Sequence, residues 1–205
     1  NFSWSIDDGQ QDPTCVNPES FITTWNTDVS GTSNVSTIII PTFSGEVYNY
    51  TVLWGDGTID EGLTGNALHD YTTPGVYEVK IYGDFPRIYF EAFIDPSGPE
   101  KILEVNQWGN IQWSSMHYAF SKCKNLIVNA TDVPDLSNVD NMSYMFNEAE
   151  LFNTDINSWD VSNVTYMDGV FLGARSFNQD ISSWDVSNVT NMSYMFFEAE
   201  SFNQD

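Results

Sequence analysis

The sequence predicts two structural units: an all-β sandwich, followed by an α/β solenoid with one short strand and one short helix per coil of about 25 residues. Two observations carry this prediction. Short apolar segments separated by Gly and Pro fill the first half of the chain, and a self-similar segment recurs in the second half. Its phenylalanines are Phe120, Phe146, Phe171 and Phe196. A period of this length is typical of stacked repeats, because one such unit cannot bury its apolar face alone.

Residues 1–20 hold few aliphatic side chains and several turn-forming pairs, such as Asp12-Pro13, so we predict an extended lead-in or linker there. Residues 21–95 alternate apolar and polar positions in segments that are typical of strands. These segments are Phe21–Trp25, Ser36–Ile40, Tyr48–Trp54 and Val76–Ile81. Their spacing, with turn residues between them, predicts a small β-sandwich.

Residues 96–119 are predicted to form the N-terminal cap of the solenoid. Ile88–Phe90 and Ile102–Val105 have the composition of strands. The segment Met116–Phe120 then echoes Met142–Phe146 of the following repeat. We expect an atypical first unit here, because an open stack of repeats has to cover its apolar end.

Residues 120–205 form the repeat array, and the apolar spacing changes within each unit. Ile156-x-x-Trp159-x-Val161 has the spacing of leucine-rich repeats, and its last two apolar residues lie two apart, as a half-buried strand requires. The next apolar residues fall at helical spacing: Val164, Met167, Val170 and Phe171. Thr165 is a suitable cap for that helix. Each coil is therefore predicted to be of the leucine-rich type.

Several repeated residues are predicted to be structural. Trp159 and Trp184 occupy the strand position that faces the core, although exposed tryptophans would instead offer stacking surfaces for sugars. Asn163 and Asn188 recur in register, and amides at a fixed turn can satisfy backbone groups of adjacent coils. The aromatic residues expected to stack in one column are Phe146, Phe171 and Phe196.

The register also predicts an ion pair. Arg175 occupies the position taken by Glu150 in the preceding unit and by Glu200 in the following unit. We expect its guanidinium to lie within salt-bridge distance of one or both carboxylates. Because water screens such a surface pair, each should contribute only about 0.2 to 1 kcal/mol.

Twenty-nine acidic and six basic residues give a net charge of −23, which argues against binding to nucleic acid or to an anionic membrane surface. A solvated acidic surface is the simplest interpretation. The alternative is that some carboxylates hold calcium, and the weak candidates are the repeated Asp155, Asp180 and Asp205. The usual calcium-loop spacing is absent, so no cofactor is otherwise predicted.

The sequence offers no catalytic constellation. His69 and His117 are the only histidines, and neither has a nucleophile or a second histidine nearby in sequence. The spacing of Cys15 and Cys123 does not indicate a disulfide. The longest aliphatic run, Thr37–Ile40, has the length of a strand rather than of a membrane span. We therefore expect a non-enzymatic protein.

A family resemblance follows from the repeat itself. The run Phe177–Phe196 resembles the repeat of BspA-like leucine-rich repeat proteins, which lie on the surface of bacteria, and the likeness covers residues 120–205. The resemblance implies a bacterial extracellular or cell-surface location and a role in binding or adhesion. It carries over no catalytic residue.

A second resemblance lies in the first half of the chain. Trp54–Thr58, followed by His69–Val79, resembles the polycystic-kidney-disease (PKD) domain, an immunoglobulin-like sandwich of extracellular proteins. The likeness covers residues 21–82. Domains of that family are usually spacers or interaction modules, so this resemblance implies presentation of a partner domain rather than chemistry.

The expected function is therefore an adhesin or other binding protein that contacts a protein or glycan ligand on another cell or surface. The alternative is an architectural component of a surface filament, a surface layer or a secretion-associated assembly, with neighbouring subunits as partners. An ancillary module of a secreted polysaccharide-degrading enzyme is a distant third. Because the chain ends inside a repeat, the sequence predicts further repeats beyond residue 205. Neither nucleic acid nor direct insertion into a membrane is expected.

Overall fold

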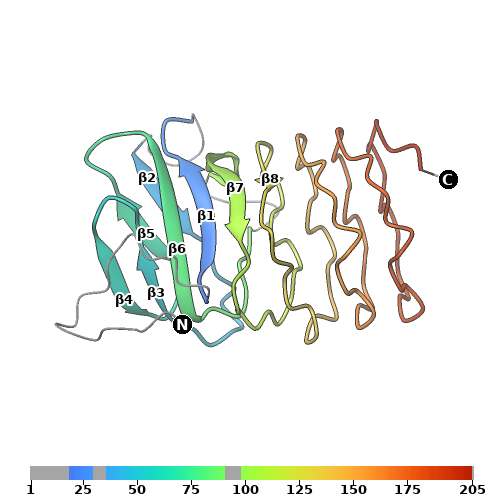
Figure 1. Ribbon diagram of the computed structural model, residues 1–205, viewed down its shortest axis with the longest axis horizontal. Coiled ribbons are helices and arrows are strands. Elements are labelled where there is room, and N and C mark those ends of the chain that lie inside the picture. Colours follow the sequence, from blue (N-terminus) through green and yellow to red (C-terminus); the bar gives the residue numbers. More distant parts are fainter. Residues whose placement is uncertain (1–18, 30–35, 91–97, 205) are drawn as a thin grey trace, which may run out of the picture.

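The computed structural model describes residues 19–29, 36–90 and 98–204 (Figure 1). Eight strands and one short 3-10 helix occur in these ranges. They are β1 (Phe21–Asn26), β2 (Thr37–Ile40), β3 (Asn49–Leu53), β4 (Ile59–Leu63), β5 (Ala67–Asp70), β6 (Val76–Asp84), η1 (Pro99–Lys101), β7 (Ile102–Gln107) and β8 (Ile127–Val128). No helix in the described part of the chain is long and apolar enough to cross a membrane.

The strands form two sheets of unequal size. Six strands pair in the order β4-β3-β6-β1-β7-β8, while β2 and β5 form a separate two-stranded sheet. All pairings are antiparallel except that of β7 with β8. Five strands follow the predicted apolar segments. β4 and β5 were not predicted because their mostly exposed residues show no buried alternation, and β8 was not predicted because it has only two residues. The strand expected at 88–90 is absent, and Phe90 instead donates its N–H to Tyr118 O at 3.0 Å.

The large sheet continues across the boundary that was predicted at residue 95. β7 comes from the segment expected to be a separate cap, yet it pairs with β1, and β8 of the first repeat pairs with β7. The core is continuous at the same place, because the Trp108 ring lies 6.0 Å from Phe120 and 5.4 Å from Trp159. The prediction of a small β-sandwich followed by a separate solenoid is therefore wrong.

The repeats form turn-rich coils, and the prediction of a leucine-rich α/β solenoid is wrong. Beyond β8, the described residues up to 204 contain neither a helix nor a strand. The β-bridges between these coils are isolated and parallel, from Asn141 to Tyr166 and from Tyr166 to Asn191. Figure 1 shows successive coils side by side along the long axis of the molecule. We call residues 116–204 the repeat stack.

The backbone explains why the apolar spacing did not produce a helix. Tyr144 and Glu148 have φ angles of 58° and 56°, in the left-handed region that interrupts a right-handed helix. The spacing of about three residues arises instead from successive tight turns, such as Met145 N–H to Met142 O at 3.1 Å. The N–H of Tyr144 donates to Asp168 O of the next coil at 2.7 Å, so the hydrogen bonds run between coils.

The predicted strand at Trp159 and Val161 is replaced by two turns. The Oδ1 atoms of Asp155 and Asp160 accept the N–H two residues further on, at 3.0 and 3.1 Å. Trp159 N–H then donates to Ile156 O at 3.1 Å. Because short polar side chains bond the local backbone in this way, they favour turns over an extended ladder.

Aromatic side chains fill the interior of the repeat stack. The rings of Phe146 and Phe171 are stacked with centroids 6.0 Å apart, and those of Phe171 and Phe196 are 5.6 Å apart. A second column stands beside the first, formed by Phe152, Phe177 and Phe202. Within one coil the two columns touch, at 3.9 Å between Phe171 and Phe177. The coils are therefore held together by ring stacking and by backbone hydrogen bonds.

Candidate functional site

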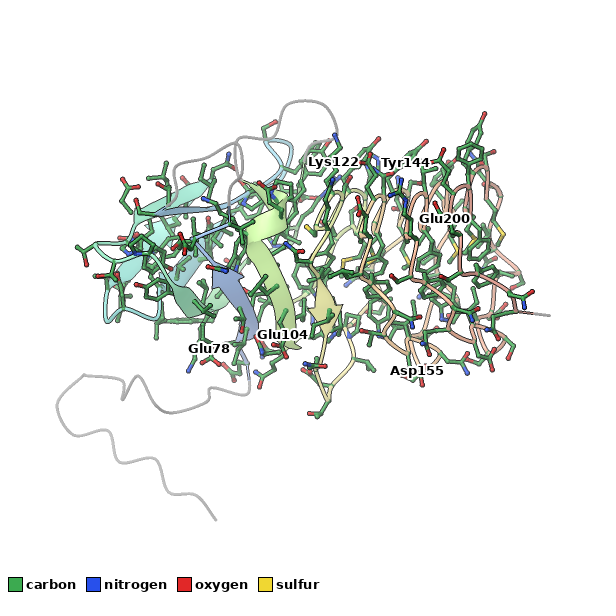
Figure 2. The ribbon with its side chains drawn as sticks, turned by 90° about the horizontal axis from the view of Figure 1, so that it is seen from above. Glu78, Glu104, Lys122, Tyr144, Asp155 and Glu200 are labelled. Atoms are coloured by element: carbon green, nitrogen blue, oxygen red, sulfur yellow. The ribbon has the colours of Figure 1, made fainter. Side chains whose placement is uncertain are left out.

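A row of aromatic side chains runs from the sheet region onto the first coils of the repeat stack. We call it the aromatic row, and its members are Phe43, Tyr89, His117, Tyr118 and Tyr144. Neighbouring rings lie 4.3 to 6.2 Å apart in the contacts that link them. All five side chains are partly exposed. Figure 2 shows Tyr144 at one edge of the stack and Asp155 at the opposite edge.

The backbone of the repeats positions the tyrosines. Tyr118 and Tyr144 occupy the same place in successive coils, with φ angles of 56° and 58°. Their rings stack 5.0 Å apart at an angle of 9°. Gly169 takes this place in the next coil, where a Cβ atom would lie 2.6 Å from Cε1 of Tyr144. The tyrosine ring thus covers the glycine, and the row ends there.

Arg87 lies beneath the row and is 7% exposed. Its Cζ atom is 4.2 Å from the ring centroid of Phe43 and 4.7 Å from that of Tyr89. Such cation–π contacts contribute about 0.5 to 2 kcal/mol each. The Nη2 atom contacts His117 twice, at 3.2 Å from the carbonyl oxygen and 3.3 Å from Nδ1. Arg87 therefore joins the sheet region to the first coil.

Arg87 forms no ion pair with any residue that the structure describes. No carboxylate of the described residues lies within salt-bridge distance, and the buried Nε has no hydrogen-bond partner. Burial lowers the pKa of the guanidinium. Burial, together with the positive charge of Arg87, also lowers the pKa of His117 to about 4, so its ring is neutral at pH 7. A buried cation that forms no ion pair is costly unless an anion approaches it.

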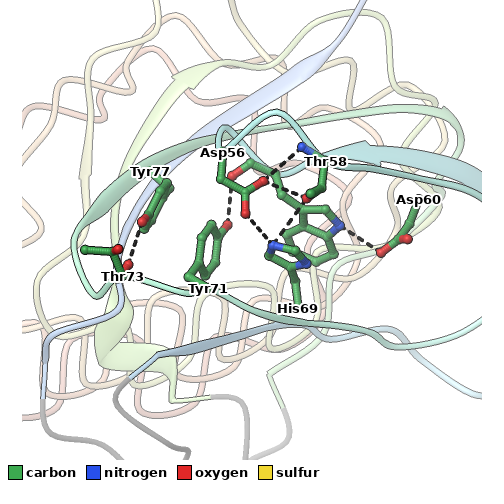
Figure 3. A network of polar contacts seen from close by, with 8 residues as sticks. Asp56, Thr58, Asp60, His69, Tyr71, Thr73 and Tyr77 are labelled. Carbon is green, nitrogen blue, oxygen red and sulfur yellow. Dashed lines mark hydrogen bonds and ion pairs between the residues drawn. The ribbon is translucent and has the colours of Figure 1, made fainter.

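A second polar cluster lies around the loop between β3 and β4 (Figure 3). Asp56 Oδ2 lies 2.8 Å from His69 Nε2, and Asp56 Oδ1 accepts the Thr58 hydroxyl at 2.6 Å. The His69 ring stacks on Trp54 at 4.8 Å, and the Trp54 Nε1–H donates to Asp60 at 2.8 Å. The contact between Asp56 and His69 holds the loop against β5.

The cluster does not have the geometry of a nucleophile, base and acid relay. Partial burial would raise the pKa of Asp56, but hydrogen bonds from Thr58 and His69 outweigh it and lower this pKa to about 2. Thr58 and Asp56 both lie against the same ring nitrogen of His69, at 3.3 and 2.8 Å. A relay needs the two ring nitrogens to serve different partners. We interpret the role of the cluster as structural, because its contacts fix the loop between β3 and β4.

Both candidate tryptophans of the repeats lie in the core. Trp159 is 5% exposed and Trp184 is 7% exposed. The Trp184 Nε1–H donates to Ile156 O of the preceding coil at 3.0 Å. Neither ring offers an open face to a sugar.

The repeated asparagines link one coil to the next. The side-chain amides of Asn163 and Asn188 donate to Ser137 O and Ser162 O, at 3.2 and 2.7 Å. In a second ladder, Oδ1 of Asn153 and Oδ1 of Asn178 each accept a backbone N–H and a glutamine side-chain N–H from the next coil. Its members are Asn153, Asn178 and Asn203, with the glutamine that follows each of the last two. Both ladders satisfy polar groups between coils.

The weak calcium candidates act in turns. Asp155 Oδ1 accepts Asn157 N–H at 3.0 Å, and Asp180 Oδ1 accepts Ser182 N–H at 2.8 Å. The hydrogen bonds from Ser182 lower the pKa of Asp180. No group of three metal-ligating side chains occurs within the described ranges. Asp205 lies outside the described residues, as does Cys15, while Cys123 is buried.

The predicted ion pair of Arg175 is confirmed for Glu200 and is not formed with Glu150. The Nε of Arg175 lies 3.4 Å from Glu200 Oε1, and both side chains are more than half exposed. Glu150 pairs instead with Lys124, at 3.3 Å. The column therefore alternates in sign from coil to coil, because Lys124 precedes Glu150 in register. We had missed this lysine, since the first repeat is degenerate in sequence.

Sequence reasoning also missed the aromatic row and Arg87. Phe43, Tyr89 and Arg87 lie far apart from the repeats in sequence, and only the tertiary structure brings them to Tyr118. One signal was present within the repeats. Gly169 aligns with Tyr144, which points to a left-handed backbone conformation at a surface position.

Comparison with protein families gives one match. The family model described as "Mycoplasma protein of unknown function, DUF285" matches residues 114–205, which is less than half of the chain. No curated protein and no solved structure matches significantly.

These findings correct both resemblances drawn from the sequence. The likeness to BspA-like leucine-rich repeat proteins fails, because the family model that matches is a different one and the described coils beyond β8 contain neither a strand nor a helix. The likeness to the PKD domain fails as well. The large sheet takes its last two strands from beyond the supposed domain, and the second sheet has only two strands. The matched family carries no assigned function.

Proposed function

We propose that this chain is a non-enzymatic binding protein that acts outside the cell and contacts a glycan through the aromatic row. The observation that carries the proposal is the row itself: five partly exposed rings in mutual contact across the junction between the sheet and the repeat stack. The apolar C–H faces of sugars pack on such rings, while tyrosine hydroxyls offer hydrogen bonds.

Two further observations support binding rather than catalysis. The Asp56, Thr58 and His69 cluster lacks the geometry of a relay, and the neutral His117 is held by Arg87 instead of by a nucleophile. The rigid setting also favours binding. Tyr118 and Tyr144 are fixed by hydrogen bonds from their N–H groups to Ser143 O and Asp168 O, at 3.0 and 2.7 Å.

A glycan-array screen of the whole chain, followed by titration of the best ligand, tests the proposal. The double variant Tyr118→Ala/Tyr144→Ala should weaken binding at least tenfold. Tyr194→Ala is the matched control, because Tyr194 has the same backbone conformation but lies beyond the break at Gly169. It should bind like the unmodified protein.

Three outcomes would contradict the proposal. If the array shows no glycan binding by a folded sample, the result favours the alternative function, an architectural component whose partners are neighbouring subunits. If Tyr194→Ala and the double variant weaken binding equally, the ligand lies on another surface. Protection of the protein from external protease in intact cells would contradict the proposed location.

A further inference from the structure

Arg87 is a buried charged residue that forms no ion pair with any described residue. It is 7% exposed, its Nε has no hydrogen-bond partner, and no described carboxylate forms an ion pair with it. Buried charges in proteins are normally paired, because removing an ion from water is costly. The chain has 29 acidic residues, yet none of those that the structure describes forms an ion pair with this buried arginine.

The surroundings of Arg87 restrict what can pair with it. Phe43 and Tyr89 cover the guanidinium at 4.2 and 4.7 Å, and His117 takes the Nη2 atom. The hydrogen-bonding capacity that remains lies in the plane of the guanidinium, where a planar carboxylate fits as a bidentate acceptor. Glu46 is close enough to influence Arg87, but its Oε1 accepts the Ser114 hydroxyl at 2.7 Å.

We infer that Arg87 is the anion-binding centre of the aromatic row and recognises the carboxylate of an acidic sugar. This inference rests on the proposed function and names the ligand class. The rings contact the apolar faces of the sugars, and the guanidinium pairs with the carboxylate once a small shift of Phe43 or Tyr89 opens its edge. An acidic peptide would supply the same carboxylate, but a row of five rings suits a chain of sugar rings better.

The net charge of −23 does not prevent this local recognition. Charges further away than about 8 Å are largely screened at physiological ionic strength. The other described arginine, Arg175, is exposed and already paired with Glu200. Arg87 is therefore the one described arginine that still lacks a carboxylate.

Two pairs of probes, each an acid and a matched neutral form, test the inference on the whole chain by calorimetric titration. They are tri-galacturonic acid with its methyl ester, and 3'-sialyllactose with lactose. We expect the acid of at least one pair to bind tenfold or more tightly than its neutral form. Arg87→Met should bind the acid no better than the neutral form, and Arg175→Met should behave like the unmodified protein.

The comparison of acid with neutral form on the unmodified protein stands even if Arg87→Met does not fold. Equal binding of acid and neutral form in both pairs would overturn the inference and leave the proposed function intact. Binding of triglutamate as tightly as the acidic sugar would overturn the assignment to glycans. Failure of the proposed function is distinct from both, because it appears as the absence of any glycan binding in the array screen.

Discussion

Single residues in the repeat stack combine a buried apolar body with one well-placed polar atom. Trp184 packs against Phe171 at 6.2 Å and also donates to Ile156 O in the preceding coil. The same residue type therefore serves as core and as a link between coils. Removing the Trp184 side chain would therefore destabilise the fold in two ways: it would leave a cavity, and it would leave the Ile156 carbonyl without its hydrogen bond.

Trp184→Ala should lower the free energy of unfolding by about 3 to 5 kcal/mol, the range for large aromatic residues in a core. Urea titration followed by circular dichroism measures it. Phe197→Ala is the control, because Phe197 is 55% exposed and should change the free energy by less than about 1 kcal/mol. An unchanged midpoint for Trp184→Ala would show that this tryptophan is not part of the core.

Gly169→Ala should be destabilising because of a contact and not because of its backbone angle. Tyr144 and Tyr194 take the same φ in neighbouring coils, but a Cβ at Gly169 would lie 2.6 Å from the Tyr144 ring. We expect a loss of about 1 to 3 kcal/mol relative to Gly62→Ala, measured by thermal unfolding. Gly62 has a similar φ of 66° and open space around it. Equal losses would mean that the ring moves aside freely.

His117 should make the stability depend on pH between about 6.5 and 4. Its pKa is lowered in the fold by burial and by Arg87, so the unfolded chain binds the proton more readily. The stabilisation is complete above pH 6.5 and is lost as the pH falls towards 4. The loss should be about 1 to 3 kcal/mol for a half-buried ring.

Urea titrations at several pH values measure this slope, and His117→Asn removes the titrating group while retaining polar atoms. The difference in free energy of unfolding between the two proteins should be independent of pH above about 7 and should change as the pH falls towards 4, because only the unmodified protein loses the His117 contribution. A slope that is the same in both proteins would assign the effect to carboxylates.

At the level of elements, the coils depend on hydrogen bonds to the following coil. Met167, Gly169, Phe171 and Gly173 donate their N–H groups to Asn191 O, Ser193 O, Met195 O and Phe197 O. The equivalent donors in the last described coil are Met192, Tyr194, Phe196 and Glu198. No such acceptor is present among the described residues.

Hydrogen–deuterium exchange should distinguish the two sets of amides. In this chain, the four amides of the last coil should exchange at least tenfold faster than the four equivalent amides of the preceding coil. Mass spectrometry of overlapping peptides measures the difference within one sample, so each coil is the control for the other. Equal protection would indicate that another chain covers the edge.

At the scale of the whole molecule, the sheet and the repeats share one core. β8 of the first repeat pairs with β7, and Trp108 contacts Phe120 and Trp159 across the junction. Figure 1 shows the large sheet passing directly into the stack of coils. Two independently folding halves are therefore not expected, despite the two textures of the sequence.

Urea unfolding should accordingly be a single cooperative transition when followed by tryptophan fluorescence and by far-ultraviolet circular dichroism. The two probes report different parts of the chain, because β-strands lie mainly before residue 129 and tryptophans lie in both halves. Midpoints that differ by more than the experimental error would show that the halves unfold separately.

The sequence by itself determined the repeat register and the ladders that follow from it. Identical residues at a fixed period must occupy equivalent places when units stack, so the phenylalanine column and the alignment of Arg175 with Glu200 could be derived without coordinates. It also located five strands, because buried alternation is a local signal. Composition likewise fixed the acidic character of the surface.

Only the tertiary structure decided the conformation of each coil and the candidate site. Apolar residues spaced about three positions apart occur both in a helix and in successive tight turns. Hydrogen bonds to the next coil decide which of the two conformations forms. The aromatic row depends on contacts between residues that are distant in sequence. Arg87 is 30 residues from His117, and their contact exists because the sheet continues into the repeats.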